Sequence, residues 1–238
     1  MKILWVNANF LHPTTKGGQI RTLEMLRRLH LRHEIHYVAF ENTAAPEALG
    51  RAGEYSTCAY AVPHRVPPRR SPAFALQLAG NLFSSMPLAV SRYRSLEMAG
   101  IIRDLRARER FDSMVCDFLF PAPNFERLDG CVLFEHNVET TIWRRHAETA
   151  GNGLLRRYFG MQAERMQAYE GEVCRKVARV IAVSPVDAAQ IRKMFGISHV
   201  TDVPTGVDLD FFSPQGASAA SSDLVFVGHV GEIGRAHV

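Results

Sequence analysis

Short apolar runs alternate along the chain with longer stretches whose apolar residues recur at helical spacing. Apolar runs bounded by turn-forming residues predict buried strands, expected at 2–6, 34–40, 57–62, 113–118, 131–134, 179–183 and 199–203. After a first helix, further helices are expected at 44–52, 71–83, 93–110, 140–149, 154–177 and 185–195. Because strand and helix alternate, we expect an α/β fold: a Rossmann-like, doubly wound, mostly parallel sheet covered on both faces.

The first thirty residues combine a strand, a glycine-bearing loop and a helix. The strand Lys2–Val6 leads through a loop to Gly17 and Gly18, where the first helix begins. Its apolar side is expected to hold Ile20, Leu23, Leu26 and Leu29. N–H groups at a helix N-terminus lack partners and attract anions, and glycine lets a ligand approach closely. The pair could equally form only a tight turn, so two interpretations stay open here.

The apolar residues of the helix at 93–110 also predict its orientation. Those expected to face inward are Leu96, Ile101, Ile102 and Leu105.

Polar residues follow the strand at 131–134 directly, and ligands of such sheets bind beyond the strand ends. His136 can hydrogen-bond a sugar hydroxyl or phosphate, or move a proton near neutral pH. Asn137 can both donate and accept. Glu139 can bind a ligand, although carboxylates are favoured in the first turn of a helix in any case. We expect a functional role for His136.

Four motifs occur in a fixed order along the chain: the loop ending in Gly17–Gly18, FEHNVE at 134–139, VIAVS at 180–184 and VPTGVD at 203–208. Together they resemble the N-terminal half of a family 4 glycosyltransferase, with Thr205 where that family usually has asparagine. The resemblance implies a GT-B fold of two Rossmann-like domains. The first would hold the acceptor and the second a nucleotide-sugar, with retaining transfer and no metal or other cofactor.

The resemblance also implies roles for individual residues. Gly17 and Gly18 would lie against the donor diphosphate, and His136 would be catalytic, facing the donor sugar near its reacting carbon. Arg21, Asn137 and Glu139 would contact acceptor or substrate. The partners implied are a nucleotide-sugar donor and a saccharide or lipid-linked acceptor, in polysaccharide, other glycan or glycolipid biosynthesis.

The C-terminal region predicts an interrupted second domain. We expect an acceptor domain at 1–214, a linker at 215–222, which is rich in Ser, Ala and Gly, and the first strand of a donor domain at 223–231. Residues 232–238 fit no part of that domain and resemble a translated sequencing adapter. The sequence therefore predicts a fragment that is inactive without its donor domain.

Composition narrows the class of protein without selecting a ligand. The 47% hydrophobic and 22% charged content is ordinary for a globular protein, and the net charge of +4 suits anionic small molecules, an anionic membrane surface and nucleic acid alike. We expect no nucleic-acid partner. The four cysteines are widely spaced, without a CxxC pair, which argues against a zinc site and indicates reduced thiols in a cytoplasmic protein.

A basic, proline-rich loop precedes the apolar helix expected at 71–83. Its cations Arg65, Arg69 and Arg70 could bring that helix to an anionic membrane as a peripheral contact. The alternative is a solvated loop leading into a packed helix.

Two other functions compete with glycosyl transfer. One is a non-catalytic membrane-docking or binding module built on the same arginines. The other is an NAD-binding oxidoreductase, because Glu41 ends the second strand about where an acid would hold a ribose. Against the oxidoreductase, the loop has no GxGxxG, and ten residues separate Val6 from Gly17.

Overall fold

The computed structural model describes residues 1–68, 70–207 and 209, and Met1–Thr205 forms one compact unit. The expected linker at 215–222, partial strand at 223–231 and tail at 232–238 lie outside the described residues, as does Arg69.

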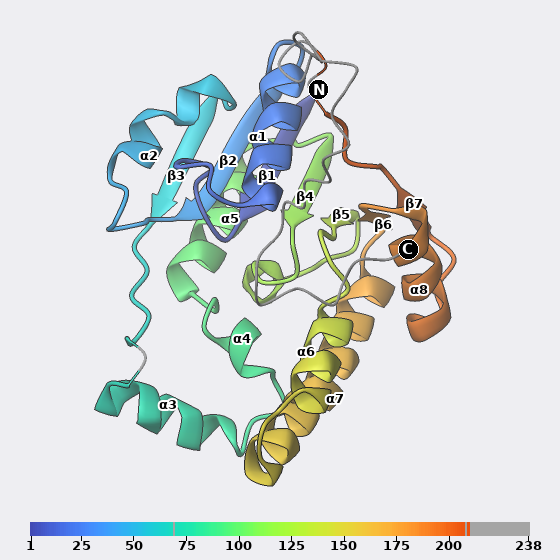
Figure 1. The fold of residues 1–238 in the computed structure, drawn as a ribbon. Coiled ribbons are helices and arrows are strands. Elements are labelled where there is room, and N and C mark those ends of the chain that lie inside the picture. The colour runs from blue at the N-terminus through green and yellow to red at the C-terminus, as the bar shows by residue number, and fades with distance from the viewer. Residues whose placement is uncertain (69, 208, 210–238) are drawn as a thin grey trace, which may run out of the picture. The chain divides into compact units, whose positions relative to one another are not determined.

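The strands of the described chain form a parallel sheet in the order β3-β2-β1-β4-β5-β6-β7 (Figure 1). They are β1 (Lys2–Asn7), β2 (Glu34–Phe40), β3 (Cys58–Val62), β4 (Ser113–Asp117), β5 (Cys131–Phe134), β6 (Arg179–Ala182) and β7 (Val200–Asp202). From β1 the chain builds outward through β2 and β3, and then in the opposite direction from β4 to β7. This order confirms the predicted Rossmann-like, doubly wound sheet, and the reversal creates a crevice beyond the ends of β1 and β4.

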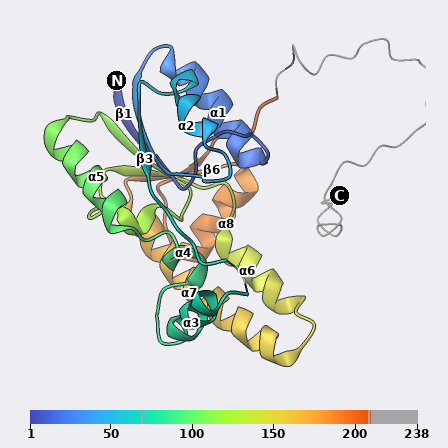
Figure 2. The ribbon, with the colours of Figure 1, turned by 90° about the vertical axis from the view of Figure 1, so that its left-hand side faces the viewer.

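Helices cover both faces of this sheet. They are α1 (Gly17–His30), α2 (Glu47–Gly50), α3 (Pro72–Asn81), α4 (Leu88–Ser91), α5 (Leu96–Arg108), α6 (Glu139–Glu148), α7 (Gly153–Lys176) and α8 (Pro185–Phe195). Side chains of β1 alternate, so Leu4 and Val6 join the core formed with α5, α7 and α8, whereas Trp5 packs on the side of α1. Figure 2 shows α1 and α5 on opposite sides of the sheet.

Several element boundaries differ from the sequence-based expectation. The helix expected at 93–110 begins only at Leu96, because the side chain of Ser95 accepts a hydrogen bond from the N–H of Met98 and ends the preceding loop. Leu96 is therefore the first helical residue and 88% exposed, so the prediction that it faces inward is wrong. The helix expected at 44–52 is split into α2 and a 3-10 turn, and α4 was not predicted.

The packed side of α1 also differs from its apolar pattern. Ile20, expected on the apolar side of the helix, is 50% exposed, whereas the polar Thr22 is buried. Thr22 is buried because its hydroxyl donates to the carboxylate of Asp117.

Every helix within residues 1–68 and 70–207 is too short or too polar to cross a bilayer.

The packing of α7 against α8 depends on Gly171. A Cβ atom at this position would lie 2.8 Å from Cδ1 of the buried Phe195, and this ring edge cannot swing away like the end of a flexible side chain. A Cβ at Gly160, in the same helix, would meet no described atom within 4 Å.

We predict opposite effects for alanine at these two glycines. Gly171→Ala should lower the free energy of unfolding by about 1–3 kcal/mol, because overpacking against Phe195 outweighs the gain in helix propensity. Gly160→Ala should raise it by up to about 1 kcal/mol. Chemical denaturation of the chain measures both, and equal stabilisation by the two variants would contradict the close packing.

Candidate active site

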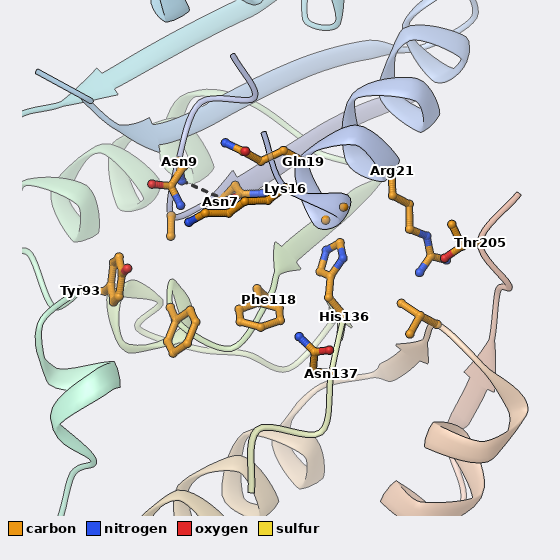
Figure 3. Close-up of a pocket in the computed structure, with 15 residues that line it drawn as sticks. Asn7, Asn9, Lys16, Gln19, Arg21, Tyr93, Phe118, His136, Asn137 and Thr205 are labelled. Carbon is orange, nitrogen blue, oxygen red and sulfur yellow. Dashed lines mark hydrogen bonds between the residues drawn. The ribbon is translucent and has the colours of Figure 1, made fainter. Parts of the chain in front are cut away.

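The carboxyl ends of β1, β4 and β5 open onto a cavity of about 470 Å³. The sheet register sets Asn7 beside Asp117, and Asp117 beside Phe134, so the segments that follow the three strands meet there. The lining residues, drawn in Figure 3, are Asn7, Ala8, Asn9, Lys16, Gly17, Gly18, Gln19, Arg21, Tyr93, Phe118, Phe120, His136, Asn137, Val183 and Thr205. The cavity thus occupies the crevice where the strand order reverses.

The fully buried carboxylate of Asp117 collects four hydrogen-bond donors beneath this cavity. Its Oδ2 accepts from Trp5 Nε1 at 2.9 Å, Asn7 Nδ2 at 2.6 Å and Thr22 Oγ1 at 3.1 Å. Its Oδ1 accepts from His136 Nε2 at 2.7 Å. A buried carboxylate is tolerated only when it is well hydrogen-bonded, so Asp117 fixes the positions of all four donors.

This hydrogen bond sets the orientation of the His136 ring. A carboxylate oxygen only accepts, so Nε2 carries the hydrogen and Nδ1 of the neutral ring is left as an acceptor. The imidazole lies between two aromatic rings, with centroids 4.8 Å from Phe134 and 5.5 Å from Phe118.

Gly18 brings the N-terminus of α1 against the same imidazole. A Cβ atom at Gly18 would lie 3.3 Å from Nδ1 of His136, which is tighter than an ordinary contact, whereas one at Gly17 would meet no described atom within 4 Å. The residue before the helix, Lys16, has no side-chain acceptor to cap it, and the first turn contains no acid. The N–H groups of this turn are suited to an external anion.

Arg21 extends the cationic side of the cavity. Its Nη2 donates to the carbonyl of Val203, and its guanidinium lies 4.7 Å from the centre of the Phe134 ring. Burial lowers the pKa of Arg21, and the negative charge of Asp117 partly offsets this effect. Nη1 is buried and has no acceptor among the described residues, which leaves a cationic donor for a ligand.

The sequence matches the family model described as Glycosyltransferase Family 4 over residues 15–211. This chain belongs to glycosyltransferase family 4. The resemblance indicated by the four ordered motifs is thereby confirmed. The match begins in the loop before α1 and includes every cavity-lining residue from Lys16 to Thr205.

Solved structures similar to this family 4 chain include the following two. One is a UDP-glucosyltransferase from Polygonum tinctorium capable of glucosylating indoxyl, with a TM-score of 0.47 and 12% identity over 87% of this chain and 52% of that one. The other is Arabidopsis thaliana UGT89C1 complexed with UDP-L-rhamnose, with a TM-score of 0.44 and 12% identity over 92% and 52%. The family 4 chain thus spans about half the length of these structures. A comparison with curated protein sequences finds no match.

Most of the expected site residues of the family 4 chain meet in the cavity. Gly17, Gly18, Arg21, His136 and Asn137 line it together. Glu139 lies instead in the first turn of α6, where its side chain is buried.

Asp117 and Phe118 were not predicted as site residues. Asp117 could have been found, because it is a polar residue at the end of an apolar strand, where ligand-binding groups collect.

Glu170, from the C-terminal half of α7, caps α6 in place of a local residue. Its carboxylate accepts from the N–H of Glu139 at 2.9 Å, from the N–H of Thr140 at 2.8 Å and from the hydroxyl of Thr140. These bonds attach the start of α6, directly after the His136 segment, to the long helix α7.

Three buried glutamates lie close together behind the site. Burial raises the pKa of Glu135 well above its usual range, and the charges of Glu170 and Glu139 raise it further. Burial and then Glu170 raise the pKa of Glu139 to about 8. Both carboxyl oxygens of Glu135 are buried without a donor among the described residues, as suits a protonated acid.

We predict that Glu139 makes stability fall as pH rises. Its pKa in the folded chain lies above its pKa in the unfolded chain, so the folded chain binds more protons. The contribution of Glu139 to the free energy of unfolding is therefore complete below about pH 4.5 and is lost as the pH rises through about 8. Glu139→Gln should therefore reduce the loss of unfolding free energy between about pH 5 and pH 8 by at least about 1 kcal/mol. Urea denaturation at several pH values measures the free energy of unfolding of each variant. The exposed Glu164 on α7 supplies the control Glu164→Gln, and equal slopes in both variants would contradict the assignment.

Proposed function

We propose that this chain is the acceptor-binding half of a GT-B glycosyltransferase. In this proposal the enzyme transfers a sugar, with retention, from a nucleotide-sugar to a saccharide or lipid-linked acceptor in polysaccharide, other glycan or glycolipid biosynthesis in the cytoplasm. The observation that carries the proposal is the convergence of His136, Gly18 and Arg21 in one cavity of a family 4 chain.

The cationic side of the cavity would receive the donor diphosphate. The N–H groups of Gly17 and Gly18 and the unpaired Nη1 of Arg21 would hydrogen-bond its oxygens. Charge develops on the diphosphate as its bond to the sugar breaks, so donors fixed in advance stabilise the leaving group. Lys16 lines the same cavity and adds positive charge. In this proposal these groups do the electrostatic work that a metal ion performs in other transferases.

His136 would bind the donor sugar close to its reacting carbon. With Nε2 donating to Asp117, Nδ1 is the atom that would accept a hydrogen bond from a sugar hydroxyl. Asn137 lines the cavity beside it and would contact the substrate. Glu139 would act indirectly, because it is buried in the first turn of α6.

In the proposed function, a second domain binds the nucleotide. We therefore predict that residues 1–238 bind inorganic pyrophosphate, as a probe of the diphosphate site, but do not transfer sugar from UDP- or GDP-sugars. Arg21→Gln should weaken pyrophosphate binding by at least about tenfold, because it removes a charge-assisted hydrogen bond. Titrations followed by NMR measure the affinity, and a radiolabelled-sugar assay measures transfer.

The two adjacent glycines provide matched variants for this experiment. Gly18→Ala should shift the imidazole signals of His136, because the new Cβ would meet Nδ1, whereas Gly17→Ala should leave them near their original positions. Pyrophosphate affinity unchanged by Arg21→Gln would overturn the diphosphate site. Sugar transfer by residues 1–238 alone would overturn the need for a second domain.

We further propose a peripheral membrane contact through α3. Of the three basic residues expected there, Arg65 and Arg70 lie in the described loop before this helix, and Leu76 and Phe83 are 77% and 95% exposed. Arg165 of α7 donates to the carbonyls of Asn81 and Leu82, so the end of α3 is fixed beside α7. Exposed apolar side chains next to cations suit the surface of an anionic bilayer.

We predict that the chain co-sediments with vesicles of phosphatidylglycerol but not with vesicles of phosphatidylcholine. Replacing both Leu76 and Phe83 by serine should abolish most of this binding, since it removes the apolar surface that would enter the bilayer. The control is Leu31→Ser, because Leu31 is 82% exposed at the end of α1. Equal binding by both variants, or none by the original chain, would contradict the contact.

A further inference from the structure

Three aromatic side chains form a continuous wall on one side of the cavity. They are Phe118, Phe120 and Tyr93, here called the aromatic wall. The ring centroids of Phe118 and Phe120 are 4.8 Å apart, and those of Phe120 and Tyr93 are 5.1 Å apart. The wall begins at His136, whose ring lies 5.5 Å from Phe118, and it leads away from the end of the cavity that holds Arg21 (Figure 3).

The backbone at Phe118 is strained in a way that places this residue at the cavity. Its φ of 75° lies in the left-handed region, which is unfavourable for a bulky residue. Phe118 directly follows Asp117, and its N–H donates to the carbonyl of Phe134 at 2.8 Å, which fixes the turn. Strain of this kind persists where the surrounding structure enforces it, and it is concentrated at functional sites.

Polar side chains face the aromatic wall across the cavity. Figure 3 shows Asn9, Lys16 and Gln19 on the side opposite Tyr93 and Phe118. The cavity therefore offers one apolar face and, across from it, amide and ammonium groups that hydrogen-bond. A flat aromatic ligand would bury only one of its faces against apolar groups here. A pyranose has an apolar C–H face and a rim of hydroxyl groups, which matches both sides.

We infer that the aromatic wall is the acceptor subsite and that the acceptor presents a pyranose ring to it. The inference rests on the proposed function and specifies its acceptor as a saccharide. The diphosphate site lies on the Gly17 and Arg21 side of His136, and the aromatic wall lies on the other. A sugar stacked on Phe120 is thus held next to His136 without overlapping the donor diphosphate.

Saturation-transfer NMR on residues 1–238 tests this inference with simple probes. The probes are the methyl pyranosides of glucose, galactose and mannose, together with phenol, each at about 10 mM so that millimolar affinities are detected. At least one pyranoside should receive saturation, strongest on the protons of one ring face. Phe120→Ala should weaken its binding by roughly three- to tenfold, the effect of losing one aromatic contact.

Matched variants separate the aromatic wall from general effects on the fold. Phe111→Ala removes a ring of the same size from the opposite end of β4 and should leave pyranoside binding unchanged. Phe118→Asn should weaken binding while tolerating the left-handed backbone. Phe120→Leu keeps most of the apolar volume but lacks the ring, so it replaces Phe120→Ala in the binding test if the alanine variant unfolds.

The outcomes distinguish this inference from the proposed function. If pyrophosphate binds and no pyranoside does, the saccharide subsite is wrong while the diphosphate site stands. Binding of phenol in preference to every pyranoside would assign the aromatic wall to an aromatic acceptor and overturn the inference. Pyranoside binding that is equal in Phe120→Ala and Phe111→Ala would also overturn it. If neither pyrophosphate nor pyranosides bind, the proposed function itself fails.

Discussion

The buried carboxylate of Asp117 is the interaction on which the site depends. Its four donors come from β1, from α1 and from the segment after β5, so one side chain ties together the elements that surround the crevice. Taking a carboxylate out of water is costly, and each donor offsets part of that cost. The same bonds leave the His136 imidazole with a single orientation. The fixed orientation of the His136 ring and the stability of the sheet centre therefore have the same cause.

His136, which Asp117 holds in place, lies between the two halves of the cavity. On one side, Gly18 lies against the imidazole, and Nη1 of Arg21 has no acceptor among residues 1–68 and 70–207, which favours an anion. On the other side, Phe118 follows Asp117 directly and turns through a strained backbone into the aromatic wall. A carboxylate fixed at the end of β4 thus determines where the polar and apolar surfaces meet. This arrangement suits a reaction that brings a phosphorylated donor and a ring-shaped acceptor to the same histidine.

The sequence predicted the sheet well because short apolar runs and helical spacing are local signals. It also located His136 and Gly18, since each stands directly at the end of a strand or the start of a helix. Local signals failed where a distant partner decides the outcome. Thr22 is buried in place of Ile20 because of Asp117, which is 95 residues away. Glu170 caps α6 from 30 residues away, and no pattern near Glu139 announces it.

The acids near the site are arranged so that their charge does not oppose an anionic ligand. Glu135 is 1% exposed, whereas the next residue, His136, lines the cavity. Burial raises the pKa of Glu135 well above its usual range and brings that of Glu139 to about 8, so burial disfavours the charged form of both acids. Two carboxylates ionised behind His136 would repel a diphosphate through a medium of low dielectric constant. Burial of Glu135 and Glu139 thus limits the negative charge behind the cavity that Arg21 and Lys16 line, while the carboxylates of Asp117 and Glu170 are each bound by several donors.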